Sequence, residues 1–335
     1  MSRLKSAFSK SFAVDILLRQ FCRQICTTET TFTRNSFDSS SEAIKLEANS
    51  SYRRMKSLHE TSITDTITLN DKVKIPCFGL GVYDIDVKLT RKAVLCALET
   101  GYRQIDTAAR YKNERSVGEA IRESGLKRQE VFVVTKVYHE DHGYNETRIA
   151  FEKSLKLLGV DFVDLYLIHF PVPGKVVETW KAMGELKEKG FIRSIGVSNF
   201  NIHHLEALKM HSEITPSVNQ IEVHPFLQES SLVDYCKDRG IVIQAYSPLT
   251  RGQKLDNHVL RSLAYQYNRT PAQILLRWSL QKGFVCIPKS FQSERIKENS
   301  KVFDFYIEEP HMEILDSLEE GYRTGRDKIL WPWNG

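Results

Sequence analysis

The chain has 335 residues, of which 41% are hydrophobic and 27% are charged, so it holds enough apolar material for a large core. This length suits either two modest domains or one (β/α) barrel of about 250 residues with an extension. The formal net charge of +5 is small and no run of five like charges occurs, so we expect no nucleic-acid binding. No apolar run approaches the roughly 20 residues of a membrane span, so we expect no membrane association.

The cysteines are scattered along the chain, so they predict neither a metal site nor a disulfide framework. Free thiols at such spacing favour a reducing compartment. The cysteines are Cys22, Cys26, Cys77, Cys96, Cys236 and Cys286.

Residues 1–62 are predicted to be a disordered leader, and residues 63–335 the folded domain. The leader is rich in Ser and Thr and shows no alternation of strands and helices. Its first 36 residues carry six basic and two acidic side chains, with apolar residues at helical spacing, as is typical of a mitochondrial transit peptide. A leader with no targeting role is the alternative, and Met55 could serve as an internal start. We therefore expect a cytoplasmic protein, or a mitochondrial one if the leader is a transit peptide.

The folded part begins with a predicted hairpin over residues 67–75, turning at Asn70-Asp71. An apolar strand at 76–82 follows, and strands and helices then alternate. Further strands are predicted near 104–106, 131–136, 163–169, 192–198, 217–221, 241–246 and 284–287. Helices are predicted near 89–100, 114–124, 145–158, 175–189, 202–210, 230–239, 256–267, 271–283 and 293–301.

Eight short strands, each followed by a helix, predict an α/β fold of the (β/α)8 TIM-barrel type with an N-terminal hairpin. The strands are continuous apolar runs, as buried parallel strands should be. A doubly wound open sheet is the alternative, since Gly79-Leu-Gly81 suggests a dinucleotide-binding loop. The third glycine of that motif is missing, because Asp84 occupies its position, so we set this alternative aside.

Polar side chains close three of the predicted strands: Asp106, Lys136 and His169. Tyr111 lies five residues after Asp106, within reach of the same barrel mouth. A tyrosine has a pKa of about 10, and a neighbouring ammonium is expected to lower it while a carboxylate holds the ammonium. Such a group can protonate a developing alkoxide, but it cannot supply two electrons, so a hydride cofactor is implied. Taken singly, each residue has a structural explanation: an ion pair, a helix-start aromatic or a core histidine.

The chain resembles the aldo-keto reductase family over nearly all of residues 66–335. The resemblance rests on segments 101–121, 165–171, 195–200, 287–290 and 295–299. It implies a catalytic tetrad of Asp106, Tyr111, Lys136 and His169, with Tyr111 as the general acid.

The resemblance also implies an NADPH site. Ser198, Asn199 and Gln220 match residues that hold the nicotinamide carboxamide, and Tyr246 matches the aromatic residue that stacks under its ring. Two cations and a hydroxyl suit a dianionic 2′-phosphate, which favours NADPH over NADH. The remaining cofactor positions are Ser247, with Lys289, Ser290 and Arg295 at the 2′-phosphate and Glu298 and Asn299 at the adenine.

The departures from the family pattern lie around the expected substrate pocket, formed by His169 with Tyr83, Tyr138 and Phe170. These three aromatic residues stand where many relatives carry tryptophan. The short segment 171–180 resembles the microbial-type branch, with its diketogulonate and glyoxal reductases and a protozoan prostaglandin F synthase. We expect a monomer that reduces small aldehydes and ketones. The alternatives are a prostaglandin F synthase-like specificity and a non-catalytic NADPH-binding subunit on the same scaffold.

Overall fold

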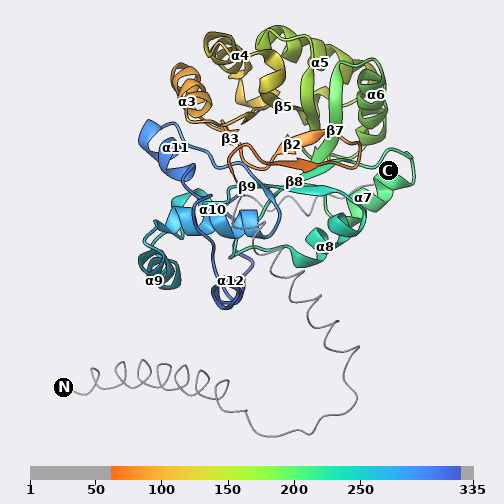
Figure 1. Cartoon of the computed structure of the whole chain (residues 1–335). Helices are drawn as coiled ribbons and strands as arrows, with labels where there is room; N and C mark the ends of the chain where they lie inside the picture. The colour runs from red at the N-terminus through yellow and green to blue at the C-terminus, as the bar shows by residue number, and fades with distance from the viewer. Residues whose placement is uncertain (1–61, 326–335) are drawn as a thin grey trace, which may run out of the picture. The chain divides into compact units, whose positions relative to one another are not determined.

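The structure is a computed structural model that describes residues 62–325, and the predicted leader lies outside these residues except for Ser62 (Figure 1). The described part starts with a hairpin of β1 (Thr66–Thr68) and β2 (Lys74–Pro76), paired antiparallel. Its turn is closed by a 2.8 Å bond from Leu69 N to Val73 O, which confirms the predicted hairpin.

The hairpin covers the end of the barrel at which the strands begin. Leu69 and Ile75 are buried against the interior side chains of the first strand residues, such as Phe132 and Val218. Asn70 Nδ2 also donates to Pro216 O at 3.0 Å, just before a barrel strand. In Figure 1 β2 accordingly lies across the centre of the barrel.

Eight parallel strands form one curled sheet in the order in which they occur in the chain. The barrel closes where β3 meets β10: Gly79 N donates to Cys286 O at 2.9 Å, and Gly81 N to Pro288 O at 3.0 Å. The predicted (β/α)8 barrel is therefore confirmed. The strands are β3 (Leu80–Gly81), β4 (Gln104–Asp106), β5 (Phe132–Val137), β6 (Val163–Ile168), β7 (Ile192–Ser198), β8 (Val218–Glu222), β9 (Val242–Tyr246) and β10 (Val285–Cys286).

Helices surround this sheet and bury their apolar faces against it (Figure 1). The helices of residues 62–325 are α3 (Val87–Glu99), α4 (Glu114–Glu123), α5 (Tyr144–Leu158), α6 (Val176–Glu188), α7 (Ile202–Lys209), α8 (Ser230–Asp238), α9 (His258–Gln266), α10 (Pro271–Gln281), α11 (Ser293–Asn299) and α12 (Glu309–Asp316). None of them is long and apolar enough to cross a membrane.

Two elements differ from the sequence prediction. The strand expected over 76–82 is shorter in the structure and comprises only Leu80–Gly81. The residues before it form backbone hydrogen bonds partly with the hairpin and partly with β10. Helix α12 was not predicted, although Pro310 in its first turn and the buried pair Met312 and Leu315 are signals of a helix.

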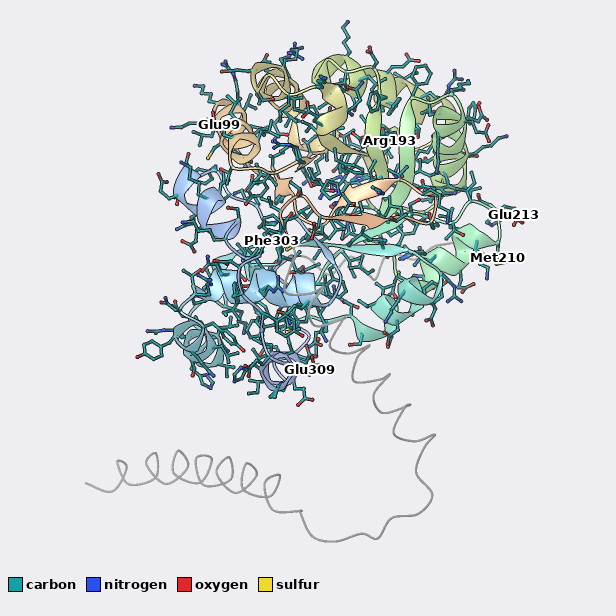
Figure 2. The ribbon with its side chains drawn as sticks, in the orientation of Figure 1. Glu99, Arg193, Met210, Glu213, Phe303 and Glu309 are labelled. Atoms are coloured by element: carbon teal, nitrogen blue, oxygen red, sulfur yellow. The ribbon has the colours of Figure 1, made fainter. Side chains whose placement is uncertain are left out.

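Aromatic rings cover the line along which the barrel closes. Phe78 lies 5.2 Å from Tyr102 between ring centroids, and Phe303, labelled in Figure 2, packs edge-on against it at 5.6 Å. The Tyr102 hydroxyl donates to Ile296 O at 2.9 Å and so ties this packing to α11. The two-residue strand β3 is thus supported by side-chain packing as well as by its backbone bonds.

Candidate active site

Four of the predicted site residues lie together where the strands end. Asp106 is the last residue of β4, Lys136 lies near the end of β5, and His169 directly follows β6. Tyr111 ends the 3-10 helix η1 (Ala109–Tyr111). Lys136 Nζ lies 2.6 Å from Asp106 Oδ1 and 5.2 Å from the Tyr111 ring centroid, and the rings of Tyr111 and His169 are 5.7 Å apart.

Buried hydrogen bonds hold the turn that carries Tyr111. Thr107 Oγ1 donates to Asn113 Oδ1 at 2.7 Å, and Asn113 Nδ2 donates to Val82 O at 2.9 Å. On the other side of the turn, Thr135 Oγ1 donates to the buried Glu114 carboxylate at 2.6 Å. The phenol is therefore presented from a segment fixed to both β3 and β5.

The Lys136 ammonium is fully buried and is held by two acceptors, Asp106 Oδ1 and Thr107 O, at 2.6 and 2.8 Å. Burial lowers the pKa of Lys136, and the charge of Asp106 opposes that effect. The ammonium therefore depends on its carboxylate partner to stay charged.

The predicted lowering of the Tyr111 pKa is wrong for this structure. Desolvation and the negative charge of Asp106 raise the pKa of Tyr111 well above its usual value. Arg110 acts in the opposite direction but does not offset them. The hydrogen bonds of the Lys136 ammonium go to Asp106 and Thr107, and the phenol stays protonated at neutral pH.

The predicted nicotinamide-binding residues contact this group directly. Gln220 Nε2 donates to Asp106 Oδ2 at 2.7 Å, and Ser198 Oγ donates to Gln220 O at 2.9 Å. Asn199 Nδ2 donates to His169 O at 2.9 Å. Cofactor residues and tetrad residues thus form one hydrogen-bonded unit.

The Asn199 side chain is fixed at its other end too, because the Tyr246 hydroxyl donates to Asn199 Oδ1 at 2.8 Å. Asn199 has a left-handed φ of 62°, which asparagine tolerates better than most residues. Ser247, next to Tyr246, is left-handed as well, with a φ of 48°. The structure therefore brings these residues together at the carboxyl ends of β7 and β9, where Asn199 follows β7 and Tyr246 is the last residue of β9.

Sequence reasoning missed Gln244, which lies beside Gln220 inside the barrel. Gln220 Nε2 donates its second hydrogen to Gln244 Oε1 at 2.7 Å. A carboxylate accepts only, so Asp106 determines which way the Gln220 amide faces, and Gln244 accepts the remaining hydrogen. Its position two residues before Tyr246, and so on the same face of β9, was the available signal.

The predicted phosphate and adenine residues lie after β10 and on α11. In residues 62–325 neither Lys289 nor Arg295, both exposed, has a carboxylate within 4.0 Å, so both charges remain available for an anion. Ser290 and Asn299 are buried beside them, and Glu298 Oε1 accepts from Thr270 Oγ1 at 2.8 Å. Two cations with no carboxylate partner in the described part of the chain, together with the Ser290 hydroxyl, suit a bound phosphate.

Aromatic rings surround the reacting end of the site. Tyr83 is 42% exposed and packs edge-on against Tyr111 at 5.2 Å between centroids. Phe170 stacks on His169 at 4.4 Å, and Tyr138 lies 6.3 Å from His169. The predicted aromatic pocket residues therefore gather around Tyr111 and His169, at the end of a (β/α)8 barrel where enzymes of this fold hold their active sites.

Comparison with known proteins shows the family to which the chain belongs. Residues 78–320 match the model of the Aldo/keto reductase family. The chain belongs to that family, and it is an oxidoreductase acting on carbonyl groups. A glyoxal reductase of Bacillus subtilis is 49% identical over 274 residues, covering 81% of this chain and 99% of the relative. A 9,11-endoperoxide prostaglandin H2 reductase of Trypanosoma cruzi is 49% identical, covering 78% of this chain and 94% of the relative.

Solved structures of aldo-keto reductases are also similar to this chain. An aldo-keto reductase from a Medee basin deep-sea metagenome library has a TM-score of 0.76 and 42% identity, covering 78% of this chain and 98% of its own. A Bombyx mori aldo-keto reductase in complex with NADP also has a TM-score of 0.76, with 36% identity, covering 80% of this chain and 96% of its own.

Proposed function

We propose that the protein reduces aldehydes and ketones to alcohols with NADPH, and that Tyr111 provides the proton. The observation that carries this proposal is the single hydrogen-bonded unit in which Gln220 joins Asp106 and Asn199 joins His169. Gln220 and Asn199 are expected to bind the nicotinamide, and Asp106 and His169 belong to the group expected to act on the carbonyl oxygen. Their direct contact suits a reaction in which a hydride and a proton reach the same carbonyl group.

NADPH, when bound, supplies the hydride. Lys289 and Arg295, which have no carboxylate partner within residues 62–325, would hold the phosphate. Ser198, Asn199 and Gln220 would hold the carboxamide, and Tyr246 would stack on the nicotinamide ring. The similarity to a Bombyx mori relative in complex with NADP supports the same cofactor.

The chain's own residues handle the proton. Tyr111 is protonated at neutral pH and donates its hydroxyl proton to the carbonyl oxygen as alkoxide character develops, since an alkoxide is a far stronger base than a phenolate. His169 orients that oxygen from the facing side. Lys136, kept charged by Asp106, stabilises the phenolate that remains.

The preferred substrates are small aldehydes and ketones. Only residues 169–175 separate β6 from α6, so the rim on this side of the mouth is short. The glyoxal reductase similarity supports small dicarbonyls, and the prostaglandin H2 reductase similarity supports a larger substrate as the second candidate. The tetrad argues against a purely NADPH-binding role, which would not require Tyr111 beside Lys136.

The test follows NADPH absorbance with a panel of aldehydes, including methylglyoxal, for the full chain and for Tyr111→Phe. We expect Tyr111→Phe to lower turnover about 10²–10⁴-fold while NADPH binding, measured by fluorescence, is unchanged. Tyr265→Phe is the matched control, because Tyr265 is 91% exposed and is not one of the residues of the proposed site. The proposal fails if wild-type protein saturated with NADPH reduces no carbonyl compound, or if Tyr111→Phe turns over at the wild-type rate.

A further inference from the structure

Arg110 lies at the mouth of the barrel, one residue before Tyr111 in η1. Its side chain is exposed, yet its position is defined: Nη1 donates to the Tyr138 hydroxyl at 2.6 Å, and its guanidinium carbon lies 5.2 Å from the Tyr138 ring centroid. Arginine carries five N–H donors in a planar fork, so this bond leaves most of the fork available.

The guanidinium is close enough to influence the reacting end of the site. Tyr138 lies 6.3 Å from His169 between ring centroids, and His169 lies 5.7 Å from Tyr111. The positive charge of Arg110 also opposes the rise in the pKa of Tyr111, so its field reaches the phenol. A carbonyl compound whose oxygen lies between Tyr111 and His169 can therefore reach Arg110 by extending past Tyr138.

No acid of the described chain neutralises this arginine. Some other arginines are paired with acids, as Arg128 and Arg193 are with the two oxygens of Asp164 at 2.8 and 2.7 Å. Within residues 62–325, by contrast, no carboxylate lies within 4.0 Å of Arg110 or of Arg251. The row of rings from Tyr83 to Tyr138 therefore has an unpaired guanidinium at each end, with Arg251 lying 5.5 Å from the Tyr83 ring.

We propose that Arg110 is a specificity-determining residue that selects carbonyl substrates carrying a carboxylate at the end away from the reacting carbonyl. Its planar fork suits the two carboxylate oxygens, and the aromatic rings on either side suit an apolar spacer between the two groups. The inference rests on the proposed reductase function and adds a charge requirement to it.

The test compares two aldehydes of nearly equal shape, 4-carboxybenzaldehyde and the neutral 4-formylbenzamide, with full-chain wild type and Arg110→Gln. The ratio of kcat/KM for the acid over the amide should fall about five- to tenfold in Arg110→Gln, mainly through KM, because an exposed ion pair is worth up to about fivefold and a bidentate one more. Arg110→Lys should keep part of the ratio, and added salt should reduce it in wild type alone.

Lys112→Gln is the matched control, since it removes one exposed positive charge two residues away, and it should change the ratio less than twofold. An unchanged ratio in Arg110→Gln, or an equal fall in Lys112→Gln, would overturn the proposal.

A binding measurement separates this inference from the proposed function. If neither aldehyde is reduced, the reductase proposal fails. The role of Arg110 can still be tested by calorimetry, which measures the affinity for 4-(hydroxymethyl)benzoate and 4-(hydroxymethyl)benzamide, two compounds that cannot be reduced by NADPH. The carboxylate should bind more tightly than the amide in wild type and lose that advantage in Arg110→Gln. Equal affinities for the two compounds in wild type would refute the role of Arg110.

Discussion

Replacing Asp106 by asparagine tests how strongly the site depends on its buried ion pair. The substitution keeps the shape and an acceptor for Gln220, but it removes the charge 2.6 Å from the Lys136 ammonium, in a pair whose side chains are 3% and 0% exposed. At an effective dielectric constant of 20, the attraction at that distance is about 6 kcal/mol. Part of this is recovered because Thr107 O still accepts from the ammonium, so we expect a loss of about 3–5 kcal/mol in unfolding free energy.

The loss should depend on pH in a defined direction. Burial lowers the pKa of Lys136 in the folded protein, and Asp106 is the group that opposes this, so the substitution lowers the Lys136 pKa further. A base with a lower pKa in the folded state binds fewer protons there than in the unfolded chain. The stability of Asp106→Asn relative to wild type should therefore rise with pH until it approaches the unfolded lysine pKa of about 10.4.

Urea unfolding of wild type, Asp106→Asn, Lys136→Met and the double variant at several pH values measures these quantities. The double variant should lie within about 1–2 kcal/mol of wild type, because replacing both members of a buried ion pair by neutral side chains leaves no uncompensated charge. The reasoning is refuted if Asp106→Asn costs less than about 1 kcal/mol, or if Lys136→Met gives no recovery in that background.

Three further substitutions test other parts of the structure. Arg295→Ala should weaken NADPH binding about tenfold or more and leave NADH almost unchanged, as fluorescence titration would show; equal weakening of both would count against the 2′-phosphate site. Gly118→Ala should cost about 3 kcal/mol or more in urea unfolding, because its Cβ would lie 1.9 Å from Leu158 O, and a stable variant would contradict that packing. Gln244→Leu leaves a buried Gln220 hydrogen without an acceptor and should cost about 1–3 kcal/mol, whereas an unchanged urea midpoint would show that the bond contributes nothing.

The sequence was sufficient for the barrel because its signals are local. Each strand is a continuous apolar run, and helix starts such as Thr270-Pro271 carry their own caps: the Thr270 hydroxyl accepts from Gln273 N. Asp106, Lys136 and His169 each lie at the end of a predicted strand. Because parallel strands all end at the same side of the barrel, this position was enough to predict that the three residues share one mouth.

What the sequence could not supply are properties set by the surroundings in three dimensions. The direction of the Tyr111 pKa depends on how deeply the phenol is desolvated and on which group the Lys136 ammonium contacts, and neither follows from spacing. The bond between Gln220 and Gln244 depends on the register of β8 against β9, which pairs them directly. The contact of Arg110 with Tyr138 joins two loops that follow different strands.

The closing contacts of the barrel have a consequence for how the chain is made. Phe78 pairs with Cys286, a partner 208 residues later in the sequence. During synthesis, β3 therefore has only β4 as a neighbour until almost the whole domain, including β10, has been made. Such a distant pairing makes ring closure a late step of folding, and until then the nascent chain exposes an unpaired apolar edge that chaperones would have to shield.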